Sequence, residues 1–179
     1  MFIDEKNKFI FIHVYKTGGE SITVFLGGQN YDHPKHIAYN ELPNWRHDYF
    51  SFGFVRNPWD RVVSSYTYLT YRNKFKGSFE EYITDFLTTP KNIQTQNDKL
   101  DGCSYIGRFE HLQEDFDEVC NIIGIPQRTL PHKNLSNLKP YSQFYTREIR
   151  NIITERTSKD IDYFGFTFDS TATKNIGIR

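Results

Sequence analysis

The stretch KFIFIHVYKTGGES occupies residues 8–21 and decides the fold class of this chain. Its first part, Lys8 to Val14, is short, apolar and rich in Phe and Ile, which predicts a buried β-strand. Gly18 and Gly19 then allow a tight turn, and Ser21 to Leu26 can form a helix that stops at two further glycines. This order of strand, glycine-containing turn and helix is typical of an α/β fold.

The same alternation continues along the chain. Phe50 to Val55 and Tyr105 to Phe109 are further strand candidates, and a short helix is expected around residues 37–42. Longer helices are expected after Asn57-Pro58, after Ser78, over residues 112–123 and over roughly 146–159. We therefore predict a three-layer, P-loop-like α/β fold with a mainly parallel central sheet flanked by helices.

Length and composition indicate one domain of ordinary globular type. We expect a single domain over residues 1–179, with a disordered tail from about 170 to 179. The 22 basic and 22 acidic side chains cancel, so net charge favours neither nucleic acid nor a membrane surface. Cys103 and Cys120 form no metal-ligand cluster and are interpreted as buried thiols. No apolar run is long enough to span a membrane and the N-terminus resembles no signal peptide, so we expect a cytoplasmic protein of unknown oligomeric state.

The turn after the first strand has the composition of a phosphate-binding loop. Lys16 supplies a mobile positive charge, Thr17 and Ser21 supply hydroxyls, and Gly18 and Gly19 permit close approach of the backbone. An ordinary turn with a solvated lysine explains the four residues KTGG equally well. The Walker A pattern GxxxxGK[ST] is absent, which weakens a kinase or NTPase interpretation.

A second candidate anion site follows the second strand. Arg56 stands where that strand ends, and its fork-shaped side chain suits a phosphate. Ser64 lies in the next helix on a face that is not the apolar one. The alternative is an Arg56 paired with a carboxylate and a solvated Ser64. Ligands of parallel α/β sheets bind beyond the carboxyl ends of the strands, so two anion sites there predict a ligand with two separated phosphate-like groups.

Four motifs, in order, now resemble those of sulfotransferases that use 3′-phosphoadenosine 5′-phosphosulfate (PAPS). They are FIHVYKTGGES at residues 11–21, FVRNPWDRVVSSY at 54–66, IGRFEHLQEDF at 106–116, and LPHKN at 130–134 with the later pair Tyr145-Thr146. The chain is most similar to the Golgi carbohydrate sulfotransferases and their small bacterial relatives, over about residues 8–168. Tyr15 and Glu20 depart from the family pattern, which has proline and threonine there.

The resemblance implies a role for each matched residue. The residues Lys16, Thr17, Gly18, Gly19, Glu20 and Ser21 form the loop that would hold the 5′-phosphosulfate. The Lys16 amine would stabilise charge on the bridging oxygen as the sulfuryl group leaves. Arg56 and Ser64 would bind the 3′-phosphate. No metal is required, and the desulfated product is 3′-phosphoadenosine 5′-phosphate (PAP).

An acceptor hydroxyl that attacks sulfur benefits from a general base. His36 is the first candidate, because KHIA at residues 35–38 is similar to a KH[AS][TS] segment of the bacterial relatives. His33 is the second candidate, and Glu41 and Glu20 are others. His13 lies within a predicted buried strand and is interpreted as structural. Gln96 resembles a glutamine of the relatives that would contact acceptor or donor.

Three functions remain open from the sequence. The first is sulfuryl transfer from PAPS to a hydroxyl by in-line displacement, with a carbohydrate as the acceptor that the family favours and a small molecule as another. The second is a non-catalytic relative that binds PAPS or PAP. The third is a P-loop nucleotide kinase, which would need Mg²⁺. A loop at residues 133–139 is a further candidate to close over the nucleotide.

Overall fold

A computed structural model of the protein describes residues 1–28, 36–44, 48–88, 95–131, 139–168 and 177–178. These residues form two compact units. Unit 1 comprises the described parts of residues 1–56, 96–133 and 172–179, and unit 2 those of 57–95 and 134–171. Each unit is described on its own below. The expectation of one domain stays a prediction. Most of the tail lies outside the described residues.

Unit 1 is built on a five-stranded sheet with the order β1-β2-β3-β4-β5. The three central strands, β2 (Phe9–Ile12), β3 (Phe50–Val55) and β4 (Tyr105–Arg108), run parallel. The edge strands β1 (Phe2–Asp4) and β5 (Gly177–Ile178) pair antiparallel to β2 and β4. The mainly parallel sheet is therefore confirmed, and the sequence pattern missed only its two short edges.

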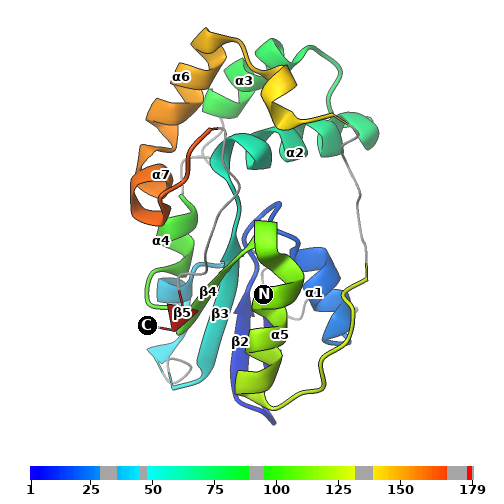
Figure 1. The fold of residues 1–179 in the computed structure, drawn as a ribbon, viewed down its shortest axis with the longest axis vertical. Helices are drawn as coiled ribbons and strands as arrows, with labels where there is room; N and C mark the ends of the chain where they lie inside the picture. The colour runs from blue at the N-terminus through cyan, green and yellow to red at the C-terminus, as the bar shows by residue number, and fades with distance from the viewer. Residues whose placement is uncertain (29–35, 45–47, 89–94, 132–138, 169–176, 179) are drawn as a thin grey trace. The chain divides into compact units, whose positions relative to one another are not determined.

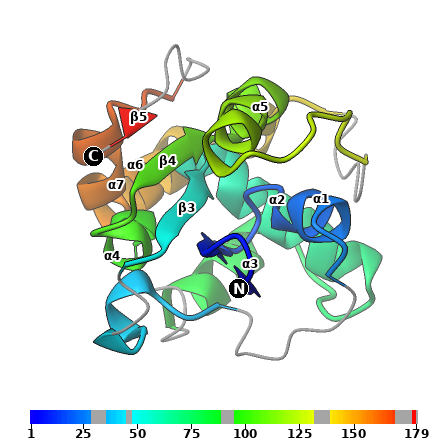
Figure 2. The same ribbon diagram turned by 90° about the horizontal axis from the view of Figure 1, so that it is seen from below.

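Helices cover both faces of this sheet. Because side chains alternate along a strand, Phe9, Phe11, Phe52 and Phe54 share one face. There they pack with α1 (Gly19–Phe25) and α5 (Leu112–Ile123), and the rings of Phe52 and Phe116 lie 6.2 Å apart. The opposite face carries α4 (Gln96–Leu100), whose Leu100 side chain packs over Gly53. Figures 1 and 2 show the strands β3 and β4 between these two helical layers, which confirms the three-layer prediction.

Short helical turns complete unit 1. They are the 3-10 helices η1 (Tyr39–Glu41) and η4 (Phe109–His111). Within η1, the Glu41 carboxylate accepts a hydrogen bond from the Ala38 backbone N–H at 2.6 Å. Cys103 and Cys120 are both buried thiols outside any disulfide, as predicted, and burial raises the pKa of the Cys120 thiol to about 11.

Unit 2 consists of helices: α2 (Pro58–Tyr71), α3 (Phe79–Thr88), η5 (Tyr141–Phe144), α6 (Arg147–Arg156) and α7 (Ser158–Phe164). The Asn57 side chain caps α2 by accepting from the N–H groups of Trp59 and Asp60, as predicted. Edge-to-face aromatic contacts fill its interior, such as Phe79 with Tyr145 at 5.2 Å.

One predicted helix, over roughly residues 146–159, is in fact two. The break falls at Thr157, whose hydroxyl donates to the Ile153 carbonyl at 2.7 Å. The Thr157 backbone leaves the helical conformation, with φ −112° and ψ 18°, so α6 ends and α7 begins there.

Candidate functional site

The loop between β2 and α1 reverses the chain through two left-handed residues. Lys16 has φ 66° and Gly18 has φ 81°, on either side of the fully buried Thr17. A lysine in this conformation is uncommon, because its Cβ crowds the backbone. The Thr17 hydroxyl donates to the Val14 carbonyl at 2.9 Å, which closes the turn. The loop thus has a defined and partly strained backbone at the end of a parallel strand.

Gly19, the first residue of α1, approaches the His13 ring closely. A Cβ built on Gly19 would lie 2.2 Å from Cδ2 and 2.3 Å from Nε2 of His13. The His13 ring is itself held by stacking on Phe11, with centroids 5.7 Å apart. His13 is buried, which agrees with its predicted structural role. Only glycine fits at position 19 with this histidine beneath it.

His36, the first candidate base, lies beside the strand that leads into the loop. Its Nδ1 is 2.9 Å from the His13 carbonyl, and its ring makes edge contacts with the rings of His13 and Tyr15 at 4.9 and 5.8 Å. A carbonyl oxygen can only accept, so Nδ1 carries the proton. In the neutral ring Nε2 then holds the lone pair, which is the arrangement that a general base needs.

Arg56 is held by three contacts from different parts of unit 1. Its guanidinium lies 3.9 Å from the centroid of the Phe109 ring, and Nη1 donates to the Lys16 carbonyl at 3.2 Å. Its backbone N–H and carbonyl pair with the Gln96 side-chain amide, both at 2.9 Å. Arg56 is only 8% exposed. The two predicted anion sites therefore meet, since the arginine of one bonds the loop of the other.

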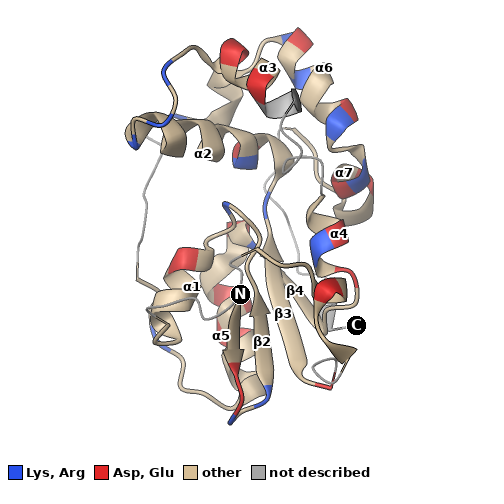
Figure 3. Cartoon of the chain, turned by 180° about the vertical axis from the view of Figure 1, so that it is seen from behind, with Lys and Arg blue, Asp and Glu red and all other residues tan. Residues whose placement is uncertain are grey.

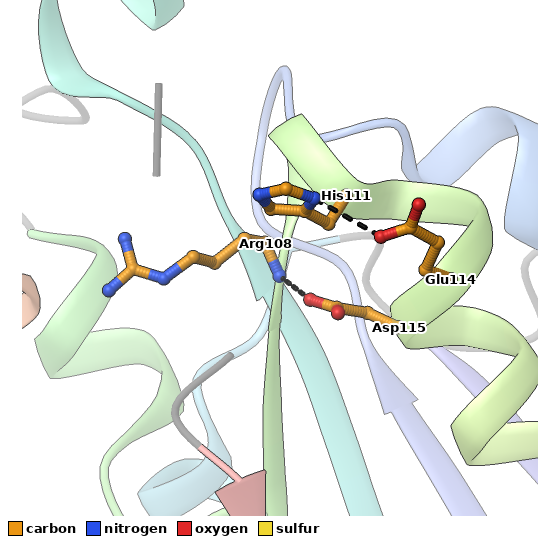
Figure 4. A network of polar contacts seen from close by, with 4 residues as sticks. All are labelled: Arg108, His111, Glu114 and Asp115. Carbon is orange, nitrogen blue, oxygen red and sulfur yellow. Dashed lines mark hydrogen bonds and ion pairs between the residues drawn. The ribbon is translucent and has the colours of Figure 1, made fainter. Parts of the chain in front are cut away.

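The segment GRFE, residues 107–110, is hydrogen-bonded to helix α5, a contact that its sequence did not indicate. Figure 4 shows the Asp115 carboxylate aimed at the backbone N–H of Arg108, a hydrogen bond of 2.5 Å, while the Arg108 side chain extends away from it. Gly107 leaves room for this approach, because a Cβ there would lie 3.1 Å from that of Asp115. Nearby, His111 Nδ1 lies 3.2 Å from the Glu114 carboxylate. Asp115 thus ties α5 to the end of β4, directly before Phe109.

The buried Asp115 makes stability depend on pH. Burial raises the pKa of its carboxyl above the ordinary value, although the bond from the Arg108 N–H opposes this. The folded protein then binds the proton more tightly than the unfolded chain, so this group's contribution to stability falls as pH rises above the ordinary carboxyl range. Asp115→Asn keeps an accepting oxygen without the charge, so we expect it to remove this pH dependence at little cost.

Asp115→Ala is the matched comparison. It leaves the Arg108 N–H without an acceptor, so we expect a loss of about 1–3 kcal/mol in the free energy of unfolding. Urea denaturation at about pH 5 and about pH 7 measures both variants. A loss for the asparagine variant as large as that for alanine would contradict this account.

The remaining predicted residues fall in different places. Ser21 is buried in α1, and Glu20 is half-buried in its first turn. Ser64 belongs to unit 2 and is buried, and its predicted role at a phosphate stays a prediction. His33 lies outside the described residues, as do residues 133–138 of the loop proposed to close over the nucleotide. Glu41 is engaged in its own turn.

The sequence did not indicate three contacts that orient the candidate site. Phe109 supports the Arg56 guanidinium, and nothing in the motif distinguishes that role from core packing. Gln96 was named from the resemblance, but its pairing with the Arg56 backbone was not expected, and its contact with acceptor or donor stays a prediction. Lys99 donates to the His36 carbonyl at 2.8 Å, and no sequence signal marks it. Each acts across a long separation in the chain, which local patterns do not report.

Charged residues of both signs occur on the helices of unit 2. Figure 3 marks acidic residues in α3 and residues of both signs in α6. Among the described residues, no group of three or more His, Cys, Asp and Glu side chains could hold a metal ion. No helix within the described ranges has the length and apolar character needed to cross a bilayer.

The fold and the loop together define the class of protein: an α/β protein with a P-loop-like strand, glycine turn and helix. A model of the sulfotransferase family matches residues 1–99, more than half of the chain. The chain belongs to the sulfotransferase family.

The chain is also similar to individual proteins. An uncharacterized protein of Archaeoglobus fulgidus is 35% identical over 85 residues, which cover 44% of this chain and 71% of that protein. Mouse sulfotransferase SULT7A1, solved in complex with PAP, superimposes with a TM-score of 0.62 at 14% identity, covering 89% of this chain and 86% of that one. A sulfotransferase of Alicyclobacillus acidocaldarius gives 0.47 at 14% identity, over 87% and 92% of the two chains. The SULT7A1 comparison shows that the sulfotransferase fold is shared.

Proposed function

We propose that this protein transfers a sulfuryl group from PAPS to a hydroxyl acceptor, and that the acceptor is a carbohydrate. The observation that carries the proposal is the hydrogen bond from the Arg56 guanidinium to the Lys16 carbonyl, because it joins the two anion-binding segments. PAPS has two separated anionic ends, a 5′-phosphosulfate and a 3′-phosphate, which fit such a pair. The complex of SULT7A1 with PAP supports the same donor.

The loop would hold the 5′-phosphosulfate. Two left-handed residues and a glycine without room for a Cβ bring the backbone close to a ligand, and the first N–H groups of a helix lack partners within it. The Thr17 hydroxyl proton is engaged on Val14, so Thr17 would contribute its backbone N–H. When bound, PAPS supplies the sulfuryl group and departs as PAP. The Lys16 ammonium would neutralise the negative charge that develops on the leaving oxygen.

Arg56 would bind the 3′-phosphate. Phe109 and the Gln96 amide hold it in place, so less side-chain freedom is lost on binding. The assignment of Ser64 to the same phosphate rests on the sequence motif alone. We also propose a cytoplasmic location, which the two buried thiols fit.

His36 is proposed as the general base. With Nδ1–H donating to the His13 carbonyl, Nε2 would accept the proton of the acceptor hydroxyl as its oxygen attacks sulfur. We expect His36→Ala to lower the rate of product formation by about 10²–10⁴-fold and to leave the affinity for PAP unchanged. Initial rates with labelled PAPS and calorimetry with PAP measure the two quantities. Unchanged rates would reject His36 as the base.

Two experiments test the proposed function itself. Calorimetry should show that the wild-type protein binds PAP without Mg²⁺, and failure to bind would reject the proposal. Mass spectrometry of a glycan library incubated with PAPS should then reveal a sulfated product. A protein that binds PAP but sulfates nothing in glycan, lipid or small-alcohol libraries is instead the non-catalytic relative.

A further inference from the structure

The five-residue helix α4 contacts both the proposed phosphate arginine and the proposed base. At its first residue, the Gln96 amide pairs with the backbone of Arg56 through two hydrogen bonds of 2.9 Å. Three residues later, the Lys99 ammonium donates to the His36 carbonyl at 2.8 Å. Arg56 and His36 come from different segments, and these contacts connect both of them to one turn of helix.

Helix α4 is itself fixed to the sheet. Leu100 is fully buried and packs directly on Gly53. A Cβ added to Gly53 would lie only 2.3 Å from the Cδ2 atom of Leu100. Gly53 is in the middle of β3, three residues before Arg56. Gln96 is also completely buried. A buried side-chain amide that satisfies both polar groups of one backbone residue leaves that residue little freedom, because any shift breaks a hydrogen bond away from water.

Lys99 acts on His36 in a different way. The hydrogen bond from His36 Nδ1 to the His13 carbonyl orients the imidazole ring. The Lys99 ammonium donates to the backbone carbonyl of His36 itself. Titratable groups in contact with His36 include His13, Tyr15 and Lys99. A charge-assisted bond to the His36 carbonyl restricts its backbone and so stabilises the ring position.

We propose that α4 is a positioning helix with two separable tasks: Gln96 sets the backbone of Arg56 for the donor, and Lys99 sets His36 in the tautomer that a base requires. The proposal rests on the proposed function and adds two positioning residues to it. Because the two tasks use different side chains, each can be removed without the other. A helix with a merely structural role would not show this separation.

The Gln96 task is tested with PAP binding. Gln96→Met keeps the size and apolar stem of the side chain but removes both hydrogen-bonding arms. We expect the Kd for PAP to rise about tenfold, with the wild-type tautomer of His36 retained. If the methionine variant fails to fold, Gln96→Glu serves as the second variant. It keeps the accepting oxygen, so we expect an intermediate rise in the Kd for PAP.

The Lys99 task is tested by long-range ¹H–¹⁵N NMR of the histidine rings. Wild-type His36 should show the Nδ1–H tautomer at a pH where the ring is neutral. Lys99→Met should shift His36 toward the Nε2–H form, whereas Lys99→Arg, which keeps a donor, should not. Neither variant should change the Kd for PAP by more than about twofold. This readout needs no acceptor.

The outcomes distinguish a failure of the proposed function from a failure of the positioning role of α4. If wild-type protein does not bind PAP, the proposed function fails, while the NMR experiment still tests the role of Lys99. If wild type binds PAP and Gln96→Met binds it equally, or if each variant alters both readouts together, the positioning role of α4 is wrong.

Discussion

Replacing Gly19 with alanine is expected to abolish measurable PAP binding and to destabilise the protein. Helix propensity alone predicts that the substitution stabilises the protein, since alanine is favoured over glycine by about 1 kcal/mol within a helix. The added Cβ would however lie 2.2–2.8 Å from three atoms of the His13 ring. That ring cannot move aside easily, because it is buried between Phe11 and His36. The loop backbone must shift instead, and the proposed phosphate site would shift with it.

The control for this prediction removes the obstacle. In Gly19→Ala combined with His13→Ala, the Cβ has room, so we expect the melting temperature to recover toward that of His13→Ala alone. Differential scanning calorimetry and titration with PAP measure stability and affinity for all three variants. A Gly19→Ala protein that is as stable as wild type and binds PAP normally would show that the close approach to His13 is unimportant.

Replacing Arg56 with alanine is expected to weaken PAP binding by about 10- to 150-fold, which corresponds to the loss of hydrogen bonds to a charged group worth about 1.5–3 kcal/mol. Two effects combine. The positive charge disappears, and the Lys16 carbonyl loses the donor that links it to β3. Arg56→Lys keeps the charge without the planar fork, so we expect a smaller loss. Calorimetry with PAP measures both variants.

Arg72 provides the matched control. It also lies over an aromatic ring, that of Tyr68 at 5.8 Å, but it is exposed at the end of α2. Arg72→Ala should bind PAP with the wild-type Kd. Equal losses for Arg56→Ala and Arg72→Ala would indicate a general effect of charge and not a specific site.

Much of the secondary structure was predictable because its elements carry their own boundary signals. Helix α5 spans residues 112–123 as predicted, since Gly124 ends it in the left-handed conformation with φ 71°. The predicted capping box of α3 is present, with Ser78 and Glu81 bonding each other's backbone N–H groups. The central strands were recognisable because strands buried on both faces are continuously apolar.

The rest depends on contacts between distant residues. Helix α4 has five residues, too few to show a repeating helical pattern, and tertiary packing at Leu100 stabilises it. The candidate site was only partly predictable for the same reason. Motifs identify Lys16 and Arg56. The partners that orient Arg56, however, lie 40 and 53 residues further along the chain, at Gln96 and Phe109.

The restraints on the loop and on His36 share one property that bears on sequence divergence. The hydrogen bonds from Thr17, His36 and Arg56 all end on main-chain carbonyls, those of Val14, His13 and Lys16. A carbonyl is present whatever side chain its residue carries. The side chains of Val14 and Lys16 can therefore change without removing these acceptors. In the laboratory the same property lets Lys16 be exchanged to probe its charge while the bond from Arg56 stays in place.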